Sequence, residues 1–288
     1  MKSGEYDAQR LRIDDPADGL RTLRGWIEYP RSAEAARERV PYVLVLHGFK
    51  GFMDWGFFPE LARRLVARGL AVIRFNFSGS GVGENPLEFS EERAFFENTP
   101  SRELEDVERV RAWLDSGALP WIEARRGALF GHSLGGAVAL IHAARRLDYH
   151  ALVTWAPVAS FRRFTPEAEA LWREQGHIEI LNARTGQVHR LGIGWLDDIE
   201  RNTRALDIAA ACRRLTTPTL LLHGSRDEAV PLVEGETLAG AFPPGVARLT
   251  ILEGGNHTFG AVHPLAGVPP TLERAFQETS EAFARRLL

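Results

Sequence analysis

Residues 128–136 read Ala-Leu-Phe-Gly-His-Ser-Leu-Gly-Gly and contain the most informative pattern in the chain, G-x-S-x-G over residues 131–135. The apolar triplet before the pattern is typical of a buried strand, and residues 136–147 favour a helix. A serine on a sharp turn between strand and helix has a strained backbone that lifts its hydroxyl clear of the sheet. The pattern therefore predicts that Ser133 is a nucleophile at the end of a strand.

Two side chains that could activate this serine follow it in the chain. A predicted strand at 219–222 leads into a loop that contains Asp227, and a predicted strand at 248–252 leads into His257. Both lie just past the carboxyl end of a strand, where open α/β sheets gather their functional groups. In this interpretation His257 takes the proton of Ser133, and Asp227 holds the imidazole in the correct tautomer.

Neighbouring residues offer weaker alternatives. Glu228 could replace Asp227 as the acid, but the frame G-x-x-D-x-x-V-P favours Asp227. His132 is expected to point into the fold beside the serine without a catalytic role. His47 and His223 each precede a glycine at a strand end and are expected to fix loops by hydrogen bonding.

A tetrahedral intermediate on the serine would carry an oxyanion, which needs backbone donors placed in advance. The amide of Leu134, directly after the serine, is one candidate. The second candidate is the amide of Phe49, in the loop His47-Gly48-Phe49-Lys50-Gly51 that follows the predicted strand at 42–46.

Together these motifs resemble the α/β-hydrolase superfamily, and within it the serine carboxylesterases of the feruloyl (cinnamoyl) esterase-like group. The segment Phe75-Asn76-Phe77-Ser78-Gly79-Ser80-Gly81 adds to the resemblance, because it stands in the place of the family's F-D-F-S-G-x-G. Asn76 replaces the usual aspartate at a structural position.

The resemblance implies an α/β-hydrolase fold over residues 1–288: a mostly parallel eight-stranded sheet with helices on both faces and a small inserted cap. It also implies cleavage of small to medium carboxylic esters, aromatic or cinnamoyl-type esters included, through an acyl-enzyme on Ser133 and without a cofactor. Another acyl hydrolase (an aminopeptidase, thioesterase or lipase) would use the same site. A carbon–carbon hydrolase shares the fold, and a non-enzymatic binding protein would normally have lost one of the three side chains.

Alternating apolar segments support this class of fold. Strands are expected at residues 9–13, 22–29, 42–46, 70–75, 128–130, 151–155, 219–222 and 248–252, and helices at 57–67, 100–114, 136–147, 166–175, 195–204 and 272–288. The first two strands are expected to form an antiparallel edge, and residues 32–39 an exposed connection.

The segment at about 158–205 is longer than one crossover helix requires and is predicted to be the cap. Residues 177–181 and 187–191 flank 182–186 as a β-hairpin would. The apolar residues expected to cover the pocket above Ser133 are Phe161, Phe164, Trp172, Ile178, Ile180 and Trp195. The alternative is an extra pair of strands that serves stability alone.

Composition adds limits. The formal net charge of −3 gives no reason to expect nucleic acid or an anionic membrane as a partner. Cys212 is the only cysteine, the charged N-terminal residues do not suggest a signal peptide, and no apolar run is long enough to span a bilayer. The nine histidines show no metal-binding spacing. We therefore expect a cytoplasmic protein that acts on a small-molecule ester, without a metal, as a monomer or a homodimer.

Overall fold

One eight-stranded sheet organises the chain, with the strand order β1-β2-β4-β3-β5-β6-β9-β10. The computed structural model describes residues 6–36, 39–85, 88–181 and 186–288. The strands of this sheet are β1 (Tyr6–Ile13), β2 (Leu23–Pro30), β3 (Val40–Leu46), β4 (Ala71–Asn76), β5 (Ile122–His132), β6 (Ala151–Trp155), β9 (Thr219–Gly224) and β10 (Ala247–Leu252). The strands from β4 to β10 are parallel, and β2 runs antiparallel to β1 and β4. The expected mostly parallel sheet with an antiparallel edge is confirmed.

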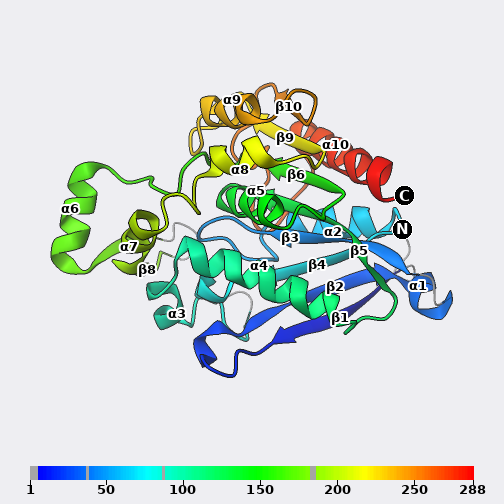
Figure 1. Cartoon of the computed structure of the whole chain (residues 1–288), viewed down its shortest axis with the longest axis horizontal. Coiled ribbons are helices and arrows are strands. Elements are labelled where there is room, and N and C mark those ends of the chain that lie inside the picture. Colours follow the sequence, from blue (N-terminus) through cyan, green and yellow to red (C-terminus); the bar gives the residue numbers. More distant parts are fainter. Residues whose placement is uncertain (1–5, 37–38, 86–87, 182–185) are drawn as a thin grey trace.

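Helices cover both faces of the sheet because successive side chains of a strand point to opposite sides. In β3, Val43 and Val45 belong to a core shared with α2 (Phe58–Val66) and α10 (Pro270–Leu287). Tyr42, Leu44 and Leu46 belong to the core on the other face. That face is covered by α4 (Pro100–Asp115), α5 (Leu134–Arg146), α8 (Ile208–Arg214) and α9 (Leu232–Ala241) (Figure 1).

The strand order reverses its direction between β3 and β5. After β3 the chain passes to β4 on one side, and it then returns to place β5 on the other side. At such a switch point the loops that leave the two strands diverge and open a crevice at their carboxyl ends. The loop after β3 and the turn after β5 therefore meet at the edge where the sequence predicts the functional groups.

The long segment between β6 and β9 forms its own cluster of elements. It contains α6 (Pro166–Gln175), β7 (His177–Leu181), β8 (Val188–Gly192) and α7 (Gly194–Arg201). Strands β7 and β8 pair antiparallel, which confirms the expected hairpin; residues 182–185 of its turn lie outside the described residues. In Figure 1, α6 and α7 lie at the opposite end of the molecule from α10.

Some elements differ from the expectation. Residues 32–39 were expected to be an exposed connection, but Arg31–Ala36 form helix α1 and Ala33 is buried. Alanine, arginine and glutamate are good helix formers, which explains the difference. The helices α3 (Glu92–Phe96), α8 and α9 were not expected. The sequence of α9 did not predict a helix because two glycines, which disfavour helices, interrupt it. One of them, Gly235, leaves room for a neighbour: a Cβ there would lie 2.5 Å from the His223 ring.

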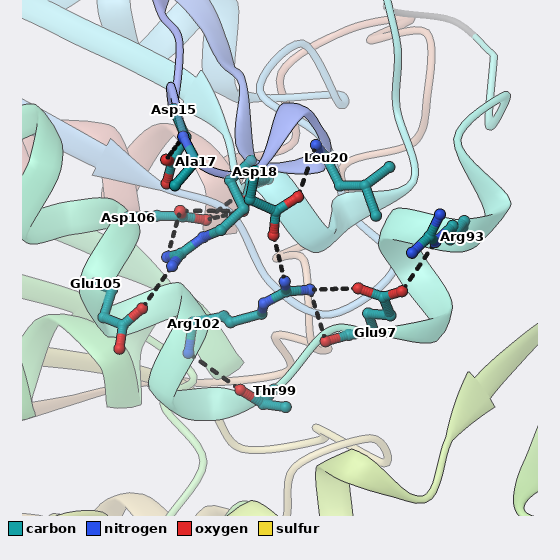
Figure 2. A network of polar contacts seen from close by, with 12 residues as sticks. Asp15, Ala17, Asp18, Leu20, Arg93, Glu97, Thr99, Arg102, Glu105 and Asp106 are labelled. Carbon is teal, nitrogen blue, oxygen red and sulfur yellow. Dashed lines mark hydrogen bonds and ion pairs between the residues drawn. The ribbon is translucent and has the colours of Figure 1, made fainter.

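A polar network joins the connection between β1 and β2 to α4 (Figure 2). Arg102 forms an ion pair with Asp18 at 2.8 Å, and the Thr99 hydroxyl caps α4 by accepting from the Arg102 amide. Deeper in the fold, the buried Asp106 carboxylate accepts from the amide and hydroxyl of Ser78. The Ser78–Asp106 hydrogen bonds hold the loop after β4 against α4, and the Arg102–Asp18 ion pair holds the connection between β1 and β2 there.

The close approach of α5 to β3 predicts a specific effect on stability. A Cβ at Gly135 would lie 2.3 Å from the His47 carbonyl oxygen, so Gly135→Ala must push the two backbones apart. We expect it to lower the free energy of unfolding by about 1–3 kcal/mol, as overpacking does. Gly240→Ala in α9, where a Cβ would meet nothing within 4 Å, should leave stability unchanged or slightly raised. Urea unfolding midpoints measure both, and a Gly135→Ala protein as stable as the parent would contradict the expectation.

Candidate active site

Ser133 occupies a strained turn between β5 and α5. Its φ is 56° and its ψ is −120°, a backbone conformation that costs a non-glycine residue about 1–3 kcal/mol. The turn is held because the Ser133 amide donates to the Trp155 carbonyl at 2.8 Å and the Gly136 amide donates to the Ser133 carbonyl at 3.0 Å. A Cβ at Gly131 would lie 2.3 Å from the Gly135 carbonyl oxygen, so the glycines of the motif permit the close contact of strand and helix.

Asp227 and His257 are in direct contact. The His257 Nδ1–H donates to Asp227 Oδ2 at 2.8 Å, while Asp227 Oδ1 accepts from the amides of Ala229 and Val230 at 2.9 and 2.8 Å. Burial raises the pKa of the Asp227 carboxyl, but the contact with His257 and the Val230 amide outweigh it, and the pKa lies below its usual 3.8. An ionised Asp227 fixes the proton on Nδ1 and leaves the other ring nitrogen of His257 free to accept one. Glu228 is exposed.

The loop after β3 lies alongside the serine. A Cβ at Gly48 would be 3.0 Å from the Ser133 Cβ. In the part of the chain that the structure describes, neither the Phe49 amide nor the Leu134 amide donates to a protein acceptor. Both donors therefore remain available beside the serine.

His47 and His223 fix the loops, as expected from the sequence. His47 Nδ1–H donates to the Gly48 carbonyl at 2.9 Å, and its Nε2 accepts from the Phe77 amide at 3.1 Å. Burial lowers the pKa of His47 to about 4, which keeps the ring neutral. The His223 Nε2–H donates to the Val230 carbonyl at 2.8 Å, in the loop that carries Asp227.

His132 makes a contact that the sequence did not indicate. Its Nε2–H donates to the backbone carbonyl of His257 at 3.0 Å, and the two ring centroids lie 4.7 Å apart. Burial, followed by the positive charge that His257 can carry, lowers the pKa of His132 to about 3. A neutral His132 thus anchors the backbone of His257 without adding a charge beside it.

A pocket of about 250 Å³ opens over Ser133 and His257. Its lining consists of Gly48, Phe49, Lys50, Gly51, Trp55, Phe58, His132, Ser133, His257 and Thr258. Lys50, Trp55 and Phe58 were not identified as lining residues from the sequence, although all three follow β3 within nine positions of Phe49. Among the described residues Ser133 Oγ makes no hydrogen bond to His257; such contacts are often long before a substrate binds.

The six apolar residues expected to cover this pocket are absent from its lining. Phe161, Trp172, Ile180 and Trp195 are buried in the core, and the Phe164 ring packs edge-on against Trp172 with centroids 4.9 Å apart. Ile178 is partly buried against the same core. Trp195 contacts a residue of the pocket lining, because its ring centroid lies 5.5 Å from that of Phe49.

Neither a metal-binding cluster nor a membrane-spanning helix occurs among the described residues. No three His, Cys, Asp or Glu side chains among them are grouped so that they could bind a metal ion. None of the helices within those residues is both long and apolar enough to span a bilayer.

Comparison with protein families identifies the group to which the chain is related. The family model described as the alpha/beta hydrolase family matches residues 43–268. The chain belongs to this family. No curated protein matches this chain in sequence.

Solved structures share its fold at low sequence identity. Est1E from Butyrivibrio proteoclasticus is 18% identical, with a TM-score of 0.68 over 96% of this chain and 98% of Est1E. Est1E with bound ferulic acid aligns with a TM-score of 0.72 at 20% identity, over 96% and 98% of the two chains. GrgF, an alpha/beta hydrolase from Penicillium sp. sh18, is 17% identical with a TM-score of 0.73, over 98% and 99%. At these identities the likeness shows the α/β-hydrolase fold.

The low pKa of His132 predicts a loss of stability in mild acid. Its pKa falls from 6.5 in an unfolded chain to about 3, so below pH 6.5 the unfolded chain binds a proton that the folded one does not. The free energy of unfolding should therefore fall by about 1.4 kcal/mol between about pH 7.5 and 5.5 from this group alone.

Urea unfolding at the two pH values measures the loss. His132→Gln, which keeps a donor but cannot titrate, should reduce the pH dependence by that amount. An unchanged pH dependence, or a His132 imidazole that titrates near pH 6.5 by NMR, would contradict the burial argument.

Proposed function

We propose that this α/β hydrolase is a serine carboxylesterase that cleaves small to medium carboxylic esters through an acyl-enzyme on Ser133. The proposal is carried by the 2.8 Å hydrogen bond between His257 and an ionised Asp227, at a pocket that Ser133 also lines. A serine hydroxyl is a weak nucleophile at neutral pH and needs such an oriented base.

Each group has a defined part in the mechanism. His257 Nε2 takes the proton of Ser133 as the oxygen attacks the carbonyl carbon, and it returns the proton to the departing alcohol. The amides of Phe49 and Leu134 stabilise the oxyanion, and Asp227 stabilises the imidazolium. A water activated by His257 then hydrolyses the acyl-enzyme. The reaction needs no cofactor.

The pocket lining supports an ester with an apolar or aromatic part. The aromatic residues Phe49, Trp55 and Phe58 belong to the lining of the pocket that Ser133 also lines. The structural neighbour Est1E binds ferulic acid, an aromatic acid, on the same fold. We propose aromatic or cinnamoyl-type esters as members of the substrate class.

We also propose that residues 158–205 act as a cap that influences substrate choice. The contact of Trp195 with Phe49 and the hydrogen bond between Lys50 and Leu181 join this segment to the loop after β3. The cap would thus act on the pocket through that loop.

Replacing the nucleophile should abolish covalent chemistry. Ser133→Ala is expected to lower kcat on nitrophenyl esters on the order of a millionfold, because triad members act as a unit. A fluorophosphonate probe followed by peptide mass analysis should label Ser133 in the parent and nothing in the variant. Circular dichroism checks that the variant is folded, and labelling of the folded variant would sink the assignment.

The acid is tested by a matched pair of neighbours. Asp227→Asn keeps the size but removes the charge that fixes the Nδ1–H tautomer, so kcat should fall roughly ten-thousandfold. Glu228→Gln makes the same chemical change at the adjacent exposed position and should stay within about twofold of the parent, because surface changes of this kind have small effects. The reverse order in steady-state kinetics would show that Glu228 is the acid.

A further inference from the structure

Lys50 gives the pocket over Ser133 an unusual charge. It is the one residue in the pocket lining whose side chain carries a permanent charge. The lining also contains two histidines, of which His132 is held neutral by burial. The nearby Asp227 carboxylate is hydrogen-bonded to His257 at 2.8 Å and is not part of the pocket lining.

The Lys50 ammonium has more hydrogen-bond donors than its one hydrogen bond within the described residues uses. It donates to the Leu181 carbonyl of β7 at 3.4 Å, so the side chain reaches from the loop after β3 to the inserted hairpin. An ammonium has three donors. In the ion pairs of the described residues Lys50 has no acidic partner, whereas many arginines of the chain are paired. A ligand carboxylate could therefore bind without displacing a protein carboxylate.

The backbone at this position is also unusual. Lys50 has a φ of 58°, in the left-handed region that favours glycine. It lies in a tight turn closed by the Gly51 amide, which donates to the Gly48 carbonyl at 3.0 Å. Strain of this kind is kept where the surrounding structure enforces it, and it is common at functional sites.

From these observations we infer that the enzyme prefers esters that carry a carboxylate, which the Lys50 ammonium binds at the pocket over Ser133. The inference rests on the proposed ester hydrolysis and adds the charge of the substrate. The carboxylate can lie on the acyl part or on the alcohol part of the ester, and the two sources are distinguished by the substrates chosen below.

The test compares esters that differ in charge but little in shape. For the acyl part, mono-4-nitrophenyl adipate is compared with 4-nitrophenyl hexanoate. For the alcohol part, 4-acetoxybenzoate is compared with methyl 4-acetoxybenzoate. The readout is the ratio of kcat/KM for the anionic ester to that for the neutral one, measured for the parent, Lys50→Met, Lys50→Arg and Lys50→Glu.

We expect the parent to favour the anionic member of one pair, and Lys50→Met to lower that ratio about fivefold, the scale of an exposed ion pair. The change should lie mainly in KM, because the ammonium binds a part of the substrate that does not react. Lys50→Arg should keep most of the ratio, and Lys50→Glu should lower it further. At about 1 M salt, where the Debye length is about 3 Å, the preference of the parent should shrink.

The contrary outcomes are distinct. If Lys50→Met lowers both members of each pair in equal proportion, Lys50 supports the loop and the hairpin, and the inference is overturned. A parent that turns over neutral esters with a normal acylation burst and shows no anionic preference also overturns it, but leaves the proposed function standing. A parent without any burst or fluorophosphonate labelling overturns both proposals.

Discussion

The close contact of α5 with β3 and β5 is the constraint on which the site depends. A Cβ at Gly131 or Gly135 would lie 2.3 Å from a backbone carbonyl oxygen. The strand and the helix can therefore approach this closely only because both positions are glycine. The strain in Ser133 follows from this contact, since the chain must reverse from strand to helix within one residue. The same contact brings the loop after β3 beside the serine, since a Cβ at Gly48 would lie 3.0 Å from the Ser133 Cβ.

Three buried histidines hold the loops around the site in place by hydrogen bonds to the backbone. His47, His132 and His223 each donate one ring N–H to a backbone carbonyl: those of Gly48, His257 and Val230. The first carbonyl lies in the loop after β3, the second belongs to the proposed base, and the third lies in the loop of the proposed acid. Burial lowers the pKa of His47 and of His132, so these two hold the loops as neutral groups. The charge at the centre is thereby left to the pair Asp227 and His257.

The aromatic residues of the inserted segment 158–205 indicate that it packs against an apolar surface, but they do not identify that surface. Its aromatic residues were expected at the mouth of the pocket, yet Trp172 is fully buried and packs with Phe164. An apolar side chain gains the same free energy against any apolar surface, so hydrophobicity alone does not select the partner. Two contacts join the segment to the loop after β3, which lines the pocket: those of Trp195 with Phe49 and of Lys50 with Leu181.

The sequence by itself determined the features that short motifs encode. G-x-S-x-G predicted the turn at Ser133, and alternating apolar segments predicted most of the sheet, because both depend on residues within a few positions of one another. Tertiary structure alone decided that His132 holds the backbone of His257 and that Lys50 meets both the pocket and β7. These contacts join residues more than a hundred positions apart. They arise from how α5, the loop after β3 and the insertion pack, which no local pattern specifies.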